Sequence, residues 1–132
     1  MSTELVLLCW TLVLPLVQVG VAGALRTRET GTGYNVGPRD SPGPPVGTLT
    51  GRMQRAQSNL YETLPLFAAA VLIAHVAGRE GTLTLWGASL YLGARVLYVP
   101  LYALGVPVVR TLVWLIASAG MLLVLLASLL PA

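Results

Sequence analysis

The chain contains no lysine, and it has only one cysteine, one histidine and one phenylalanine among its 132 residues. A single cysteine, Cys9, excludes an intramolecular disulfide and any metal site built on cysteines, so no metal site is expected. All eight basic residues are arginine, without a basic run or a stripe interleaved with aromatics, so we predict no nucleic-acid partner. His75 lies on an apolar stretch and is expected to be packed or interfacial rather than catalytic.

Charge of either sign is scarce. Only 10% of the residues are charged, 55% are hydrophobic, and the mean hydropathy is +0.76. A water-soluble domain of this size needs a far more polar surface. The composition therefore predicts an integral membrane protein, with the lipid bilayer as its main surroundings and little mass outside it.

Four apolar stretches are long enough to cross a bilayer, which takes about 20 helical residues. Helices are expected because backbone polar groups in lipid must be satisfied within the segment. The stretches cover approximately residues 5–25, 52–77, 82–104 and 108–130. Short links, such as residues 78–81, make consecutive helices antiparallel neighbours. We therefore predict an all-α fold for residues 1–132: a single domain that forms an integral membrane four-helix up-down bundle.

The remaining segment, residues 26–51, is polar and rich in proline and glycine, which predicts an irregular loop. Arginines concentrate on its side of the membrane, whereas the opposite side has only Arg79. Positively charged residues are retained in the cytoplasm. The loop is therefore expected to be cytoplasmic, with both termini on the non-cytoplasmic side.

The first apolar stretch has an alternative interpretation as a signal peptide. Only Glu4 precedes it, so it lacks a basic leading region. It is also longer than the usual signal-peptide core of about 7–15 apolar residues. We therefore expect a retained transmembrane helix.

Polar residues form one stripe on each of the two middle helices. At 100° per residue, each stripe lies within an arc of about 80° or less. The second helix carries Arg52, Arg55, Asn59 and Glu62, and the third carries Tyr91, Arg95, Tyr98 and Tyr102. An arginine in mid-membrane costs about 2.5–3.5 kcal/mol on insertion scales, so Arg95 should face protein or a wet cavity and find a partner. Glu62 is the candidate partner.

Simpler explanations exist for each group. Arg52 and Arg55 could be topology anchors, Glu62 and Arg95 a structural ion pair, and the tyrosines an interfacial belt. Together, however, the two stripes suit a small zwitterionic ligand. Arginine forks match carboxylates, and a glutamate accepts an ammonium group. A peptide such as glutathione offers all of these partners.

Two segments carry a family resemblance. "RAQSNLYETLPLF" contains an R-A-x-x-N-x-x-E-x-x-P-x-F pattern, and "ARVLYVPLY" contains R-x-x-Y-x-x-x-Y. With these motifs the chain resembles the MAPEG superfamily of membrane-associated proteins in eicosanoid and glutathione metabolism, and it looks most like the bacterial members. The resemblance extends over nearly the whole chain. It implies a homotrimer in a bacterial inner membrane, with glutathione, or another small thiol, between subunits near the cytoplasmic face.

Site residues follow from the same resemblance. Arg110 would lie near the glutathione sulfur and stabilise the thiolate, which is the catalytic role. Arg26 or Arg28 could reach the ligand of a neighbouring subunit. The residues expected to bind the cofactor, with Arg95 included as a member of the same stripe, are Arg52, Arg55, Gln57, Asn59, Glu62, Arg95, Tyr98 and Tyr102.

Departures from the prostaglandin synthase of that family limit what the resemblance implies about the reaction. Thr111 stands where that enzyme has serine, Trp114 where it has tyrosine, and Ser58 where it has arginine. Binding of a thiol peptide is therefore better supported than any particular reaction.

Three functions are compatible with these features. The leading hypothesis is a glutathione-dependent transferase or peroxidase that acts on lipophilic electrophiles. The second is a non-catalytic membrane scaffold or interaction protein that retains the fold, and the third is a small transporter. The spans show no internal repeat or paired broken helices, which disfavours transport. Arg110 separates the first two, because an enzyme needs it directed into the pocket.

Overall fold

A computed structural model describes residues 1–41 and 43–131 of the chain. Its elements are α1 (Thr3–Thr30), α2 (Thr32–Val36), α3 (Thr48–Val76), α4 (Thr82–Ala103) and α5 (Pro107–Leu129). No strand occurs over these described residues. The predicted all-α class is therefore confirmed.

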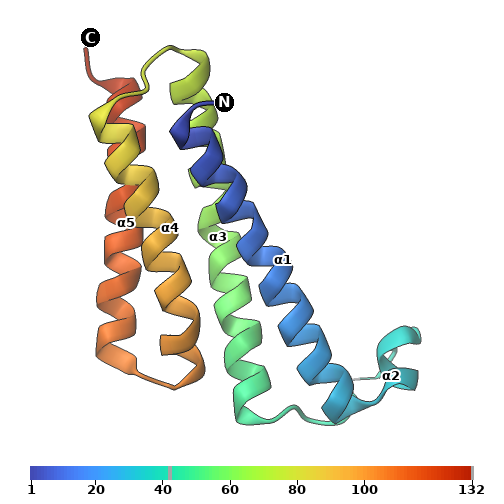
Figure 1. Cartoon of the computed structure of the whole chain (residues 1–132). Helices are drawn as coiled ribbons and strands as arrows, with labels where there is room; N and C mark the ends of the chain where they lie inside the picture. Colours follow the sequence, from blue (N-terminus) through green and yellow to red (C-terminus); the bar gives the residue numbers. More distant parts are fainter. Residues whose placement is uncertain (42, 132) are drawn as a thin grey trace.

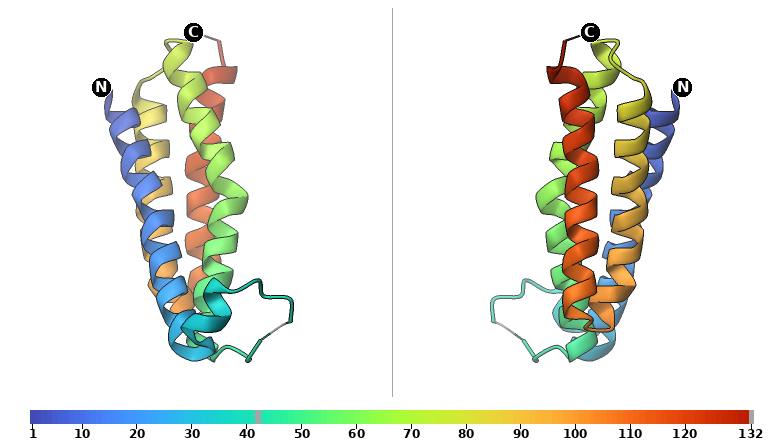
Figure 2. Two further views of the ribbon diagram at one scale, coloured as in Figure 1. Left: turned by 90° about the vertical axis from the view of Figure 1, so that its right-hand side faces the viewer. Right: turned by 90° about the vertical axis from the view of Figure 1, so that its left-hand side faces the viewer.

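The four long helices lie side by side and alternate in direction (Figures 1 and 2). One end of the molecule, here called the terminal end, carries both termini and the α3–α4 turn (Figure 1). The other, called the loop end, carries the α1–α3 connection with α2 and the α4–α5 turn. Helix α4 packs most extensively against α5, and α1 packs mainly against α3.

Helix α1 is longer than predicted and continues to Thr30, so the irregular connection is shorter than residues 26–51. Arg26 and Arg28 accordingly lie in the last turns of α1 rather than in a loop. Polarity in the sequence marks where a helix leaves the hydrocarbon, not where its backbone hydrogen bonds end. At this boundary Asn35 Nδ2 donates to Thr27 Oγ1 over 2.7 Å, which ties α2 to α1.

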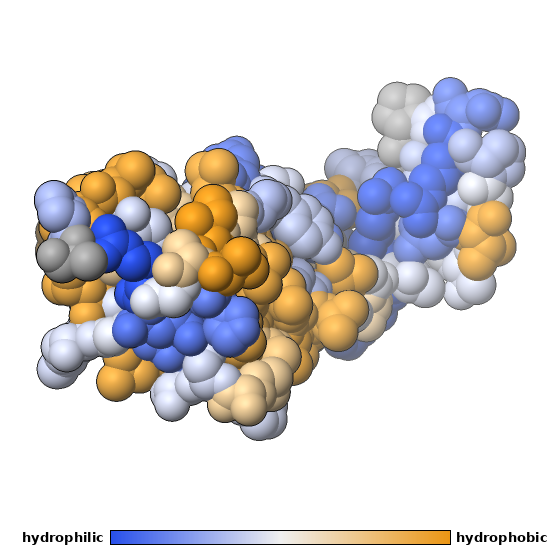
Figure 3. Space-filling view, turned by 90° about the horizontal axis from the view of Figure 1, so that it is seen from above, coloured by the Kyte–Doolittle hydropathy of each residue, from blue (hydrophilic) through white to orange (hydrophobic). Residues whose placement is uncertain are grey.

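In the part of the chain that the structure describes, three helices, α1, α3 and α5, are long and apolar enough to cross a membrane. Helix α4 is not among them, because an arginine and several tyrosines dilute its apolar character. Three of these residues, Tyr91, Arg95 and Tyr98, are buried inside the molecule rather than exposed at its sides. Seen from the terminal end, hydrophobic residues surround a small hydrophilic group, and the hydrophilic loop end lies behind (Figure 3). These features fit an integral membrane protein.

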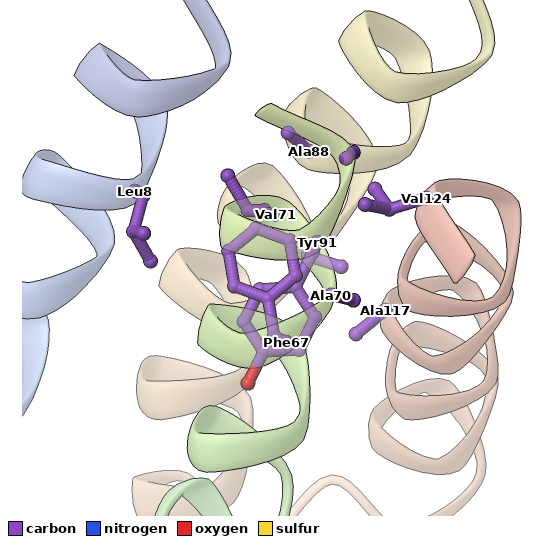
Figure 4. Close-up of a cluster of buried hydrophobic side chains, with 10 residues drawn as sticks. Leu8, Phe67, Ala70, Val71, Ala88, Tyr91, Ala117 and Val124 are labelled. Carbon is purple, nitrogen blue, oxygen red and sulfur yellow. The ribbon is translucent and has the colours of Figure 1, made fainter. Parts of the chain in front are cut away.

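The apolar core lies between all four long helices in the terminal half (Figure 4). The rings of Phe67 and Tyr91 stack with their centroids 4.0 Å apart. Next to them α4 and α5 approach closely, since a Cβ built on Gly87 would lie 2.5 Å from the Gly120 carbonyl oxygen. The contact thus requires residues without a side chain, as is common between membrane helices.

Polar contacts at the terminal end join α1 to the α3–α4 turn; we call this group the terminal clasp. Ser2 Oγ donates to Glu80 Oε2 over 2.5 Å, and His75 Nδ1 lies 2.9 Å from Glu80 Oε1. These hydrogen bonds, first that from Ser2 and then that with His75, lower the pKa of the Glu80 carboxyl. Thr84 Oγ1 donates to the buried Glu4 carboxylate over 2.6 Å. Helix α1 is therefore bonded into the fold at its first residues.

Candidate functional site

A pocket of about 420 Å³ lies between α3, α4 and α5, toward the loop end. We call it the polar pocket. Its lining residues are Arg55, Ser58, Asn59, Glu62, Tyr98, Tyr102, Arg110, Thr111 and Trp114. The structure thus brings together most of the residues that the sequence nominated, from both polar stripes and from the start of α5.

Arg52 lies in an adjoining recess of about 310 Å³ that shares Arg55, Tyr102 and Arg110 with the polar pocket. Its Nη1 donates to the Ala103 carbonyl over 3.2 Å. This bond ties the start of α3 to the end of α4 at the loop end. Arg52 is therefore next to the polar pocket but does not line it.

Tyr102 contacts two of the arginines, Arg55 and Arg110. Arg55 Nε donates to the Tyr102 hydroxyl over 3.2 Å, and the Arg110 guanidinium carbon lies 4.5 Å from the centroid of the Tyr102 ring. The ring of Tyr98 meets that of Tyr102 edge-on at 5.6 Å. Cation–π contacts of this kind orient a guanidinium while its N–H donors remain available. Two arginine forks from different helices are thus held at one pocket.

Arg95 does not line the pocket but lies behind it, with only 1% of its surface exposed. Its Nη1 donates to Asn59 Oδ1 over 2.7 Å, and its guanidinium carbon lies 4.3 Å from the Tyr98 ring centroid. The prediction that Glu62 pairs with Arg95 is wrong, because within the described residues the only ion pair is His75–Glu80. Glu62 is exposed and faces the pocket instead. Helical periodicity placed Asn59 and Glu62 on the same face of α3, but it could not predict which of the two side chains bonds to Arg95 on α4.

Gln57 lies on another side of α3. Together with Arg26 it lines a separate pocket of about 430 Å³ formed by α1, α2 and α3, which we call the α1–α3 groove. Its Nε2 donates weakly to the Tyr61 hydroxyl over 3.4 Å. Residues 55 and 57 point in directions about 160° apart on a helix, because each residue turns by 100°. Gln57 is therefore not part of the polar pocket of its own chain.

Three lining residues were not nominated from the sequence as binding residues: Ser58, Thr111 and Trp114. A signal existed for two of them. Ser58 lies one turn after Arg55, and Trp114 one turn after Arg110, so each shares a helix face with a nominated arginine. The Nε1 of Trp114 is buried and has no hydrogen-bond partner within the described residues. It is a donor that a ligand or water can satisfy.

Above the polar pocket, α3 and α5 form a second depression of about 470 Å³, which we call the apolar groove. Its lining residues are Leu66, Ala69, Ala70, Ile73, Ser118, Met121, Leu122 and Leu125. Leu66 comes one helical turn after Glu62, and Ser118 one turn after Trp114. The apolar groove therefore continues the polar pocket toward the terminal end.

These features define an integral membrane protein with a polar pocket between its helices. A family model, described as the MAPEG family, matches residues 4–130, and the chain belongs to that family. The family includes glutathione transferases and peroxidases, and its members commonly use glutathione. Comparisons with curated proteins and with solved structures produced no significant match.

Proposed function

We propose that the protein is a glutathione-dependent transferase or peroxidase that acts on lipophilic electrophiles. One observation carries this proposal: a pocket with two arginine forks and an exposed carboxylate continues along α3 and α5 into an apolar groove between these two helices. A water-soluble anionic thiol and a hydrophobic molecule can meet at that junction. Neither a scaffold nor a helix anchor requires such an arrangement.

The donor set of the pocket fits glutathione. The peptide has two carboxylates, one ammonium group and one thiol. Arg55 and Arg110 offer forked donors that match carboxylates or a thiolate, with Arg52 close by in the recess. Glu62 is exposed in the same pocket and can accept the ammonium group. Charges of both signs are thus available where a zwitterion needs them.

Catalysis would depend mainly on Arg110. When bound, glutathione supplies a sulfur nucleophile for transfer to an electrophilic carbon or for reduction of a hydroperoxide. The guanidinium of Arg110, held over the Tyr102 ring, would stabilise the negative charge on sulfur. The walls of the pocket and groove would hold the two reactants together and exclude water from between them.

The apolar groove would take the hydrocarbon part of the electrophile. Among the described residues that line it, Ser118 has the only polar side chain, so binding there would depend on apolar contact and shape. The groove faces the sides of the molecule, where hydrophobic residues are exposed, which suits entry from the bilayer. This supports lipophilic over water-soluble electrophiles.

A homotrimer is supported by the position of Gln57 and Arg26. Both line the α1–α3 groove and not the polar pocket of their own chain. In an assembly that sets this groove against the polar pocket of the next subunit, both side chains would reach one ligand. Arg28 does not line the groove, so Arg26 is the better candidate of the two.

The distribution of arginines supports one orientation of the protein in the membrane. Most arginines lie at the loop end, which favours a cytoplasmic loop end and termini on the non-cytoplasmic side, in a bacterial inner membrane. The polar pocket is nearer the loop end, where cytoplasmic glutathione would arrive.

Calorimetric titration of the purified protein in detergent with glutathione tests the proposal. Wild type should bind, and Arg55→Ala and Glu62→Ala should each weaken binding by about tenfold or more, which corresponds to about 1.4 kcal/mol. Arg79→Ala, at the terminal end, is the matched control and should bind as wild type does. Absence of binding by folded wild type would leave the non-catalytic scaffold as the better interpretation.

A further inference from the structure

The burial of the Arg95 guanidinium is energetically costly. Arg95 is buried, and its Nε and Nη2 have no hydrogen-bond partner within the described residues. Its one side-chain bond goes to a neutral amide rather than to a carboxylate. A buried cation that forms no salt bridge within the described residues normally costs stability. If a function offsets this cost, the residues that Arg95 contacts should indicate what it is.

Asn59 accepts a hydrogen bond from Arg95 and Tyr98 lies under its guanidinium, and both line the polar pocket, whereas Arg95 itself does not. An arginine can only donate hydrogen bonds, so it must face the amide oxygen of Asn59 and not the nitrogen. The Asn59 NH₂ group then points away from Arg95. Since Asn59 lines the pocket, its two N–H donors are available on the pocket side.

We propose that Arg95 is a positioning residue that fixes the Asn59 amide with its NH₂ group toward the pocket and holds the Tyr98 ring in place. Without the arginine, the amide could turn either end to the pocket. With it, the Asn59 amide presents only its N–H donors to the pocket, which selects a carboxylate or peptide carbonyl on the ligand at this position. This inference rests on the proposed function for the identity of the ligand, but the orientation of the amide does not depend on that identity.

A purely structural role for Arg95 makes a different prediction. If the arginine only held α3 and α4 together, Arg95→Met would lower the melting temperature. If it positions the pocket at the expense of stability, an apolar chain of similar length should leave the melting temperature unchanged or raise it, while ligand binding weakens. The two readouts therefore move in different directions.

Nuclear magnetic resonance can observe the amide directly, because Asn35 and Asn59 are the only asparagines in the chain. Labelling asparagine with ¹⁵N gives two side-chain NH₂ signals, and Asn35→Asp assigns them. In wild type without ligand, the Asn59 NH₂ protons should exchange with water in the pocket. Arg95→Met should shift this signal. An NH₂ group protected from water in wild type would overturn the inference.

Glutathione titrations complete the test. Arg95→Met should weaken binding by about tenfold, and Asn59→Asp should weaken it at least as much while raising the melting temperature, since a carboxylate would pair with Arg95. Arg79→Met is the matched control and should bind as wild type does. If Arg95→Met fails to fold, Arg95→Leu, which also removes the charge and the donors, should give the same shift of the Asn59 signal and the same loss of affinity.

The outcomes separate the two proposals. Normal glutathione affinity in folded Arg95→Met, or a lower melting temperature with unchanged affinity, would overturn the positioning role. If wild type binds no glutathione but its Asn59 signal exchanges with water and responds to Arg95→Met, the proposed function fails. The positioning of the amide then stands.

Discussion

The terminal half and the loop half of the molecule are built from the same helices, but they differ in whether their polar groups bond to one another or face a pocket. In the terminal half the rings of Phe67 and Tyr91 stack in the core, and the clasp residues bond to one another. In the loop half Arg55, Glu62 and Arg110 surround a pocket and retain capacity for further partners. The comparison indicates that packing in the terminal half provides the stability that lets the loop half keep unpaired charge.

The largest effect should come from breaking the core of the terminal half. Phe67 is fully buried, so Phe67→Ala should lower the free energy of unfolding by about 3–5 kcal/mol on the scale measured in soluble proteins. Glutathione affinity of the folded fraction should stay unchanged. Thermal denaturation in detergent and calorimetry measure the two quantities. Leu97→Ala, which removes an exposed side chain from α4, is the matched control and should change stability little. Equal losses of stability and affinity would show that the halves are not separable.

Arg110→Met should be the largest perturbation of the loop half. The turnover rate with a lipophilic electrophile should fall by about 10²–10³-fold, as on loss of one charge-stabilising donor. The melting temperature should stay close to that of wild type, because Arg110 is only half-buried and lies over one ring. Stopped-flow or steady-state kinetics measure the rate, with Arg79→Met as the control. A variant that retains the wild-type rate would rule out Arg110 as the catalytic group.

A third change sharpens the comparison within α4 and α5. A Cβ on Gly120 would lie 2.6 Å from the Gly87 carbonyl oxygen, so Gly120→Ala should destabilise the fold by about 1–3 kcal/mol. Gly93→Ala is the matched control: its Cβ would meet nothing within 4 Å, so helix propensity should make it neutral or stabilising. Both are measured by thermal denaturation. Similar effects at the two glycines would contradict the close approach of the helices.

The smallest effect concerns pH at the terminal clasp. The folded-state pKa of Glu80 is lowered by its hydrogen bonds with Ser2 and His75, so the clasp contributes stability above the usual glutamate value of 4.5. That contribution is lost as the pH falls below 4.5 through the lowered folded-state pKa. Melting temperatures across this range should therefore fall more for wild type than for Glu80→Gln. Identical pH profiles would mean that the carboxylate does not stabilise the fold.

Much of the fold could be predicted from local patterns. Long apolar runs predicted the all-α class, since lipid requires the backbone to satisfy its own hydrogen bonds. Periodicity placed Arg55 and Glu62 on one face of α3 and Tyr98 and Tyr102 on one face of α4, and the structure has all four around one pocket. The predicted positions of the helix ends were less accurate, because α1 continues past its apolar segment to Thr30.

By itself, the sequence determined the membrane-embedded helical class and the residue types of the site, because hydropathy and helical period are properties of neighbouring residues. Only the tertiary structure decided that Arg95 bonds to Asn59 rather than Glu62, and that Gln57 faces a different groove. These outcomes depend on the rotation and distance of one helix relative to another. Packing between helices sets both, at contacts such as that of Gly87 with Gly120, and no single helix encodes them.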